Sequence, residues 1–233
     1  MRESEGYFLL LPRGFRMHRP AALLICLLLL PTSFLCAEEK PEAPQPESKV
    51  KKLFDGKTLK GWKINDKGYY KDHGEVSVKD GAIHLAKGDP ATGIVLSTQP
   101  PKMNYEVRLE AKRVAGSDFF CGLTFPVADT HQTLIVGGWG GGVTGLSNVD
   151  GMAAVENDTT GYTEFENDKW YKIRVRVEPK AIRVWIDDEK IIHLNPEGRR
   201  LDIWIEQDTS KPLGIGTWYT GSALRNIEIE KLD

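Results

Sequence analysis

Strict two-residue alternation of apolar and polar side chains is the feature that most constrains the fold of this chain. Residues 104–112 read NYEVRLEAK and residues 171–178 read YKIRVRVE, so every second side chain is apolar. A strand with this period places one row of side chains on a core and the other toward solvent. Turn signals such as 79–81 and 178–180 recur between such runs, and no segment has apolar residues at helical spacing. The sequence therefore predicts an all-β fold, a jelly-roll β-sandwich of antiparallel strands.

Segment 117–145 is the part of the predicted sheet best suited to a ligand. Two strand-like runs, 118–127 and 130–136, flank a short Ala-Asp turn, and the second run opens into a glycine-rich loop. Loops held by a sheet are frequent sites of binding and catalysis. The segment also brings together an acid, a histidine, an amide and an indole, namely Asp118, His131, Gln132 and Trp139.

The glycines of this loop do not indicate a nucleotide site. Gly140, Gly142 and Gly145 have the spacing G-x-G-x-x-G. A dinucleotide site requires that turn to open a helix within a βαβ unit, whereas residues 146–151 read LSNVDG and predict a loop. We expect the glycines to let the backbone turn tightly beside a ligand or at a strand corner.

A second candidate surface lies on the predicted hairpin of residues 170–178 and 181–187. If the apolar side chains of its first strand face the core, Arg174 lies on the opposite face and Trp185 shares that outward phase. A sugar ring could stack on the indole while the charged groups bind its hydroxyls. The alternative is that a loop or a second layer covers Trp185.

The N-terminus has the three-part pattern of a secretory signal peptide. A basic stretch precedes the apolar run 21–30, and Ala37 supplies a small residue for cleavage. The pattern predicts a signal peptide over 1–37, read from Met1 or from Met17, although a retained anchor is the alternative. Residues 38–49, EEKPEAPQPESK, predict a linker because they cannot bury a core. One domain over 50–233 remains, so we expect a secreted or periplasmic protein without a membrane span in its mature form.

Charge and cysteine content narrow the classes of partner. Removing residues 1–37 takes away four arginines and two glutamates, leaving 27 basic and 31 acidic side chains and a formal charge of −4. Such a protein is a poor candidate for binding nucleic acid or anionic lipid, which favours a neutral ligand. Cys121 is the only cysteine of the mature chain. It has no disulfide partner, and its apolar strand predicts a buried hydrophobe.

Possible metal ligands and paired acids are spread along the sequence. His73, His84, His131 and His193 are scattered, which argues against zinc. A calcium site stays open because 148–150 and 156–158 carry oxygen ligands, although solvated acidic turns are the simpler interpretation. Several loop carboxylates could supply an acid and base for glycoside chemistry, namely Asp118, Glu156, Asp158, Glu164, Glu166 and Asp168.

Four motifs resemble the 3-keto-disaccharide hydrolase domain family. They are LFDGKTLKGW at 53–62, VKDGAI at 78–83, YEVRLE at 105–110 and LRNIEI at 224–229. The resemblance spans about 50–233 and implies a concanavalin A-like sandwich that acts on glycosides oxidised at C3. A C3 ketone acidifies the C2 proton, so a base can remove it while the C1 substituent departs, and water adds afterwards. In this scheme we expect His131 as the base and Asp118 or Glu156 as its orienting group or as the acid.

Other functions stay open. The family has a Gln-x-His segment shortly before its final Arg-Asn-Ile, whereas this chain has Thr217-Trp218-Tyr219. The chain could instead be a non-catalytic lectin-like or laminin-G-like module that presents Trp139, Trp185 and Trp218 to a carbohydrate. A third interpretation is a domain that only stabilises an envelope assembly. The fold alone does not decide among them.

Overall fold

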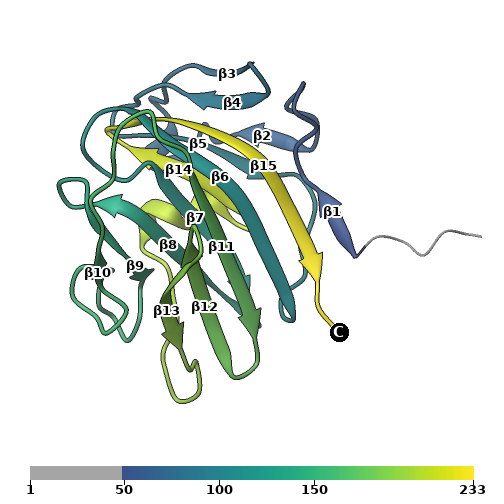
Figure 1. Cartoon of the computed structure of the whole chain (residues 1–233), viewed down its shortest axis with the longest axis vertical. Coiled ribbons are helices and arrows are strands. Elements are labelled where there is room, and N and C mark those ends of the chain that lie inside the picture. Colours follow the sequence, from purple (N-terminus) through teal and green to yellow (C-terminus); the bar gives the residue numbers. More distant parts are fainter. Residues whose placement is uncertain (1–48) are drawn as a thin grey trace, which may run out of the picture. The chain divides into compact units, whose positions relative to one another are not determined.

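The structure, a computed structural model, describes residues 49–233 (Figure 1). The predicted signal peptide and residues 38–48 of the predicted linker lie outside the described residues. The described chain consists of antiparallel strands in two sheets and two short 3-10 helices, so the predicted all-β sandwich is confirmed. None of the helices in 49–233 has the length and apolar character needed to cross a membrane.

Sheet A contains eight strands. Their order across the sheet is β13 (Glu189–Leu194), β12 (Ala181–Ile186), β11 (Tyr171–Glu178), β6 (Tyr105–Ala115), β15 (Gly221–Lys231), β4 (Ala82–Leu85) and β3 (Val76–Lys79), and β1 (Val50–Lys52) pairs with the end of β15. The predicted hairpin of β11 and β12 is confirmed, with Arg174 paired to Trp185.

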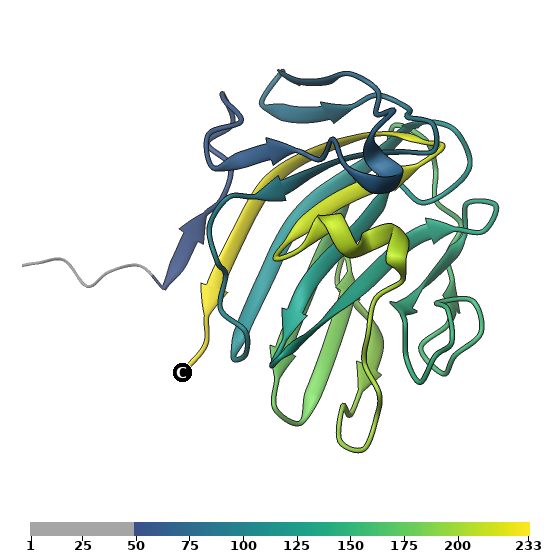
Figure 2. The same ribbon diagram turned by 180° about the vertical axis from the view of Figure 1, so that it is seen from behind.

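Sheet B contains seven strands. Their order is β10 (Gly161–Tyr162), β9 (Val143–Ser147), β8 (Thr130–Gly138), β7 (Cys121–Val127), β14 (Gly214–Trp218), β5 (Ala91–Leu96) and β2 (Trp62–Ile64). The helices η1 (Gly68–Tyr70) and η2 (Ile205–Ser210) lie against the outer face of this sheet (Figure 2). The two strands predicted within 117–145 are confirmed as β7 and β8, but the predicted loop at 146–151 is wrong at its start. Leu146 and Ser147 belong to β9 because the core buries Leu146 and β8 pairs with both residues.

The core lies between the sheets, where the alternating apolar side chains meet. Val107 and Leu109 of β6 face it from sheet A, and Leu123 and Phe125 of β7 face it from sheet B. Each fully buried side chain of this size contributes about 2 kcal/mol. The hydroxyl of Tyr105 crosses the core and donates to the carbonyl oxygen of Pro126 at 2.6 Å, which ties the two layers together. Cys121 is also fully buried in this core, as its strand predicts.

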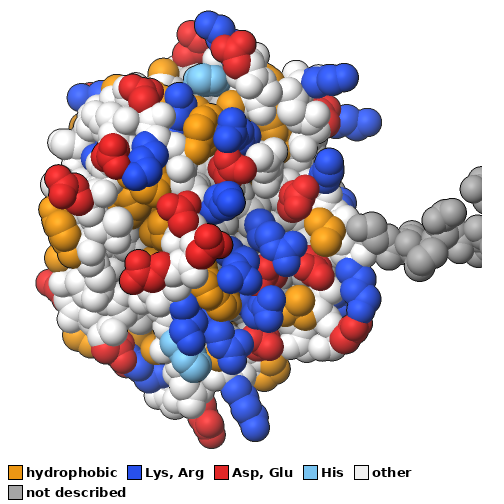
Figure 3. All heavy atoms as spheres, viewed as in Figure 1, with side chains coloured by type: hydrophobic (Ala, Val, Ile, Leu, Met, Phe, Trp, Pro, Cys, Tyr) orange, Lys and Arg blue, Asp and Glu red, His pale blue; other side chains and the backbone are white. Residues whose placement is uncertain are grey.

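The outer face of sheet A is a charged network. Glu106 is completely buried at its centre, with its carboxylate 2.6 Å from both Arg108 Nε and Arg176 Nε, and 3.6 Å from Arg174. Lysine and arginine side chains gather across the middle of this face (Figure 3). Arg174 also lies 3.8 Å over the Trp185 ring. The polar side chains that alternate with the core residues of β6 and β11 therefore form an ion-pair network around one buried anion.

Asp55 organises the first turn of the domain. Its carboxylate accepts the backbone N–H of Thr58 at 2.7 Å and of Lys57 at 2.8 Å, and the Thr58 hydroxyl at 2.7 Å. These bonds, the Thr58 N–H first, lower the pKa of Asp55 to about 2. Because the pKa is lower in the folded state, the stabilisation is present above the ordinary pKa of 3.8 and is lost as the pH falls toward 2.

We therefore expect the difference in free energy of unfolding between the wild type and Asp55→Asn to be constant near neutral pH. That difference should shrink as the pH falls from about 5 to 2, because both side chains are then uncharged. Denaturant unfolding at a series of pH values measures it. A difference that does not change over this range would contradict the assignment.

Candidate functional site

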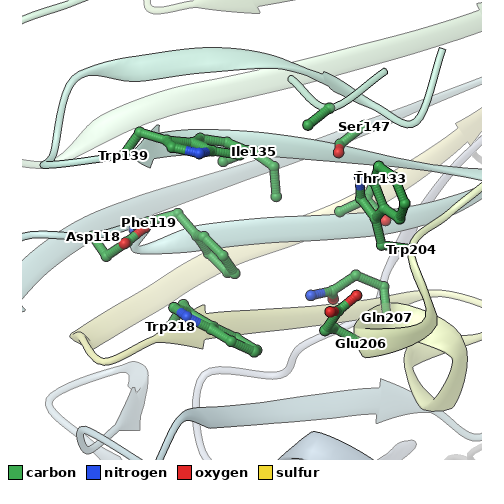
Figure 4. A pocket seen from close by; sticks show the side chains of 11 residues that line it. Asp118, Phe119, Thr133, Ile135, Trp139, Ser147, Trp204, Glu206, Gln207 and Trp218 are labelled. Atoms are coloured by element: carbon green, nitrogen blue, oxygen red, sulfur yellow. The ribbon is translucent and has the colours of Figure 1, made fainter. Parts of the chain in front are cut away.

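A cleft of 350 Å³ opens on the outer face of sheet B (Figure 4). Strands β8, β9 and β14, the segment just before β7, the loops that follow β8 and β9, and the segment of η2 all contribute to it. Its lining residues are Asp118, Phe119, Thr133, Ile135, Trp139, Ser147, Ala153, Trp204, Glu206, Gln207 and Trp218.

A row of glycines lies beside the cleft. Gly216 of β14 pairs with Gly93 of β5 and with Gly122 of β7, so three neighbouring strands lack side chains at one level. A Cβ on Gly216 would lie 2.4 Å from the Tyr70 hydroxyl, and a Cβ on Gly122 would lie 2.8 Å from the Phe119 ring. The missing side chains thus let two aromatic rings lie directly on the sheet.

Tyr70 links this row to one wall of the cleft. Its buried hydroxyl donates to Gln207 Oε1 at 2.8 Å. Burial raises the pKa of Tyr70 to about 12, so the hydroxyl keeps its proton and remains a donor. Gln207 is thereby held in η2, and the same segment carries Trp204 and Glu206 into the cleft. Trp204 is 41% exposed, which leaves ring surface available to a ligand.

Asp118 is the carboxylate at the opposite end of the cleft. The backbone N–H of Phe119 donates to it at 2.7 Å, and its own N–H donates to the Thr220 hydroxyl at 3.0 Å. Burial raises the pKa of Asp118, while the N–H groups of Phe119 and Trp139 and the charge of Arg113 oppose that rise. A carboxylate with a raised pKa is a stronger base, and such groups are common in active sites.

Arg113 supports the Trp139 loop from inside the sandwich. It continues the core-facing phase of β6 and donates through Nη2 to the Gly141 carbonyl oxygen at 2.5 Å. Its side chain is buried, its Nε has no hydrogen-bond partner, and it forms no ion pair within residues 49–233. Burial lowers the pKa of Arg113, and the charge of Asp118 opposes that lowering. Because burying a guanidinium without an ion pair is costly, its position favours a role in holding Asp118 and the loop.

Trp139 and Trp218 complete the aromatic surface. Trp139 has a left-handed backbone, with φ of 46°, and is 47% exposed. Bulky residues rarely adopt this conformation, and such positions cluster at functional sites. Trp218 stacks on Phe119, with ring centroids 6.1 Å apart and an interplanar angle of 25°. Aromatic faces between two carboxylates suit a pyranose ring, which has apolar C–H faces and hydroxyls at its edge.

The structure brings together only some of the site residues predicted from sequence. Asp118, Trp139 and Trp218 line the cleft. His131 shares the outward phase of Thr133 but lies seven residues along β8 from Gly138, which is where Asp118 packs. Seven residues of strand span about 23 Å, so His131 and Asp118 do not form a dyad. Burial, followed by the charges of Lys211 and Lys102, lowers the pKa of His131.

Gln132 and Glu156 do not line the cleft. Gln132 is fully buried, and its Nε2 donates to the Asn148 carbonyl oxygen at 2.9 Å. It shares the phase of core-facing Leu134, a placement that the alternation itself could have predicted. Glu156 is exposed and contacts the N–H of Ala153 in the loop after β9.

Arg174 and Trp185 lie on the outer face of sheet A, on the other side of the sandwich from the cleft. The predicted shared face is confirmed. Arg174 covers the Trp185 ring, so a neighbouring cation occupies the surface that was considered for a sugar. These two residues and Trp218 therefore cannot contact one small ligand together.

The loops considered for calcium are joined by an arginine. Arg199 lies 2.6 Å from the Asp150 carboxylate and 2.9 Å from that of Asp158. The side-chain amide of Asn157 donates to the carbonyl oxygens of Leu146 and Ala153, both at 2.8 Å. No group of three or more His, Cys, Asp or Glu side chains in the described part of the chain is arranged to hold a metal ion.

Sequence reasoning did not identify Trp204, Glu206 and Gln207. Residues 201–210 read LDIWIEQDTS, which combines an indole, a carboxylate and an amide within four positions. The same combination marked 117–145 as a candidate site, so a signal was present. Its link to the cleft depends on the Tyr70–Gln207 hydrogen bond between segments 137 residues apart.

Three solved structures with a similar fold have carbohydrate-related names. The Crh5 transglycosylase in complex with NAG matches with a TM-score of 0.56 at 13% identity, covering 80% of this chain and 85% of that one. The carbohydrate-binding module CBM66 from Bacillus subtilis matches with a TM-score of 0.51 at 12% identity, covering 73% and 95%. An immunostimulatory antigen and pseudo β-1,3-glucanase of Mycobacterium tuberculosis matches with a TM-score of 0.51 at 11% identity, covering 79% and 98%. At these identities the likeness establishes the fold alone.

The sequence comparisons place the chain more narrowly. No curated protein sequence matched it. The profile of the 3-keto-alpha-glucoside-1,2-lyase-like domain matches residues 49–230, which is nearly the whole of the described sandwich. The concanavalin A-like jelly roll and the family expected from the motifs at 53–62 and 224–229 are thus confirmed. The chain belongs to the 3-keto-alpha-glucoside-1,2-lyase-like domain family.

Proposed function

We propose that the protein is an exported carbohydrate-active enzyme that cleaves 3-keto-glycosides in the cleft of sheet B, with Asp118 as the general base. The observation that carries the proposal is the placement of Asp118. It is the cleft carboxylate whose pKa burial raises, and it lies among the rings of Trp139, Phe119 and Trp218. The family description supports the substrate class.

The proposed reaction is an elimination across C1 and C2. Asp118 takes the C2 proton, which the neighbouring C3 ketone acidifies, and the electron pair passes to the ketone oxygen as an enolate. The enolate re-forms the ketone as the C1–O bond breaks and a C1–C2 double bond forms. The departing oxygen takes up a proton from the carboxyl group of Glu206, on the opposite wall of the cleft. Water adds to the unsaturated sugar in a later step, which gives net hydrolysis.

The experiment follows a 3-keto-glucoside and the matching unoxidised glucoside with the purified domain, residues 50–233. We expect alcohol release and ultraviolet absorbance of an unsaturated ketone from the oxidised substrate only, because the parent glucoside has no acidic C2 proton. Release from both substrates at equal rates would instead indicate ordinary glycoside hydrolysis and would reject the elimination.

A carbohydrate-binding module is the second candidate, favoured by the exposed indoles of Trp139 and Trp204. In that case, calorimetry would detect binding of the 3-keto-glucoside without any release.

Export rests on the predicted signal peptide at 1–37, and the N-terminal sequence of the mature protein tests it. Cleavage after Ala37 is the expected result, and an intact N-terminus in the cell would contradict export.

A further inference from the structure

The aromatic surface does not end at the rim of the cleft. Beyond Trp218, its ring lies 6.0 Å from the ring of Tyr69 in η1 and 6.0 Å from that of Tyr219, the next residue in the chain. Neither tyrosine lines the cleft, yet Tyr69 is 43% exposed and Tyr219 is 46% exposed. Trp218 is therefore shared between the cleft and a second aromatic surface, which we call the tyrosine shelf and define as Tyr69, Tyr219 and Lys87.

The backbone fixes both tyrosines of the shelf. Tyr69 precedes Tyr70, which is completely buried and bonded to Gln207 of the cleft wall, so η1 is anchored while Tyr69 points outward. Tyr219 has a left-handed backbone with φ of 45°, and its N–H donates to the Pro90 carbonyl oxygen at 2.6 Å. A bulky residue in this conformation is uncommon and is found most often at functional positions. Trp139, across the cleft, has the same unusual backbone.

Lys87 supplies a polar group at the shelf. Its Nζ lies 5.9 Å from the centroid of the Tyr219 ring. The Tyr69 and Tyr219 hydroxyls are further hydrogen-bonding groups at this surface. Exposed ring faces with hydrogen-bonding groups at their edges suit a pyranose, which has apolar faces and equatorial hydroxyls. This is the same kind of ligand that we propose for the cleft. A surface that continues directly from the cleft through Trp218 would contact the next unit of the same ligand.

We propose that the tyrosine shelf is a second pyranose-binding subsite, so that the ligand of the cleft is an oligosaccharide extending over Trp218. This inference rests on the proposed function, because it needs a sugar in the cleft. It goes beyond it by assigning the residues that recognise a ring next to the one in the cleft. The shelf takes no part in the chemistry, so its effect is confined to affinity.

The test measures binding of a one-ring and a two-ring 3-keto-glucoside to Asp118→Asn, in which the proposed mechanism predicts strongly reduced turnover. Calorimetry should give about three- to tenfold tighter binding of the two-ring ligand, the contribution of one aromatic contact. Adding Tyr69→Ala and Tyr219→Ala should abolish that gain and leave the affinity for the one-ring ligand unchanged. Tyr69→Phe with Tyr219→Phe, the matched control, should keep most of the gain because the rings remain. Thermal unfolding verifies that every variant is folded.

The other outcomes separate the two proposals. Equal affinity for both ligands, or a gain that persists in the double alanine variant, overturns the subsite and leaves the cleft assignment intact. A double alanine variant that loses affinity for both ligands equally also overturns it, because the tyrosines would then only support the cleft. Absence of binding by either ligand overturns the cleft assignment and the subsite with it.

Discussion

Replacing Asp118 by asparagine is expected to lower turnover of a 3-keto-glucoside by about 10²- to 10⁴-fold, the usual contribution of a general base. The amide keeps the size of the side chain and still accepts from the Phe119 N–H, so affinity for the substrate should change little. Steady-state kinetics and calorimetry on the same preparation measure the two quantities. Asp129→Asn is the matched control, because Asp129 lies on the β7–β8 turn with a side chain that is 99% exposed.

A variant Asp118→Asn with wild-type turnover would remove Asp118 from the mechanism. The pH dependence adds an independent readout. The base must be ionised, so turnover should rise with pH through the pKa of Asp118, which burial places above its ordinary value. Because the Arg113 charge lowers that pKa, Arg113→Met should move this limb to higher pH. A loss of rate with an unmoved limb would give Arg113 a purely structural role.

Replacing the buried Glu106 of sheet A by alanine is expected to lower the free energy of unfolding more than the other substitutions proposed above. Glu106→Ala leaves Arg108, Arg174 and Arg176 facing one another without their shared anion. Breaking a buried ion pair costs about 3 to 5 kcal/mol. Since the three arginine side chains are each about a third exposed and can turn toward water, we expect the lower end, about 3 kcal/mol. Urea unfolding measures it.

Glu106→Gln separates charge from packing. The amide fills the same space and offers one acceptor oxygen, so it should cost less than the alanine variant. Added salt should narrow the gap between the wild type and Glu106→Gln, because screening weakens the lost attraction. If Glu106→Ala unfolds at the same urea concentration as the wild type, the network contributes nothing to stability. Turnover should be unaffected in either variant, because the cleft lies on the other sheet.

The fold could be predicted because its pattern is local. Alternation over 105–111 and 171–177 fixed which side chains face the core, and the turn at 178–180 fixed a hairpin. The family motifs then pointed to the jelly roll. The strand character of Leu146 and Ser147 could not be predicted. They belong to β9, which has only five residues, and so short a strand between a glycine-rich turn and a loop shows too little alternation to be recognised.

The site was only partly predictable because it is assembled from distant segments. Asp118 and Trp139 are near one another in sequence and both reach the cleft. His131 was grouped with them, but a strand carries it away from Asp118 by its own length. Glu206 comes from the opposite wall, through contacts between η1 and η2 that no local pattern encodes. The spacing of residues in the sequence predicts which face of the sheet each side chain of a strand occupies. It does not predict which loops of the folded chain lie close together.

The pairing of β1 with the end of β15 makes this domain suitable for circular permutation. Val50 lies opposite Glu230, and the side chains of Lys49 and Asp233 form an ion pair, so the first and last described residues are neighbours at one edge of sheet A. A short glycine-serine linker could join them, and the chain could be reopened at the exposed turn between Asp187 and Asp188. Such a circular permutant would keep every strand of sheet B in its order. Its new ends would lie at the other end of the strands of sheet A, away from the old termini. Attachment to a surface through these ends would present the cleft in the reverse orientation.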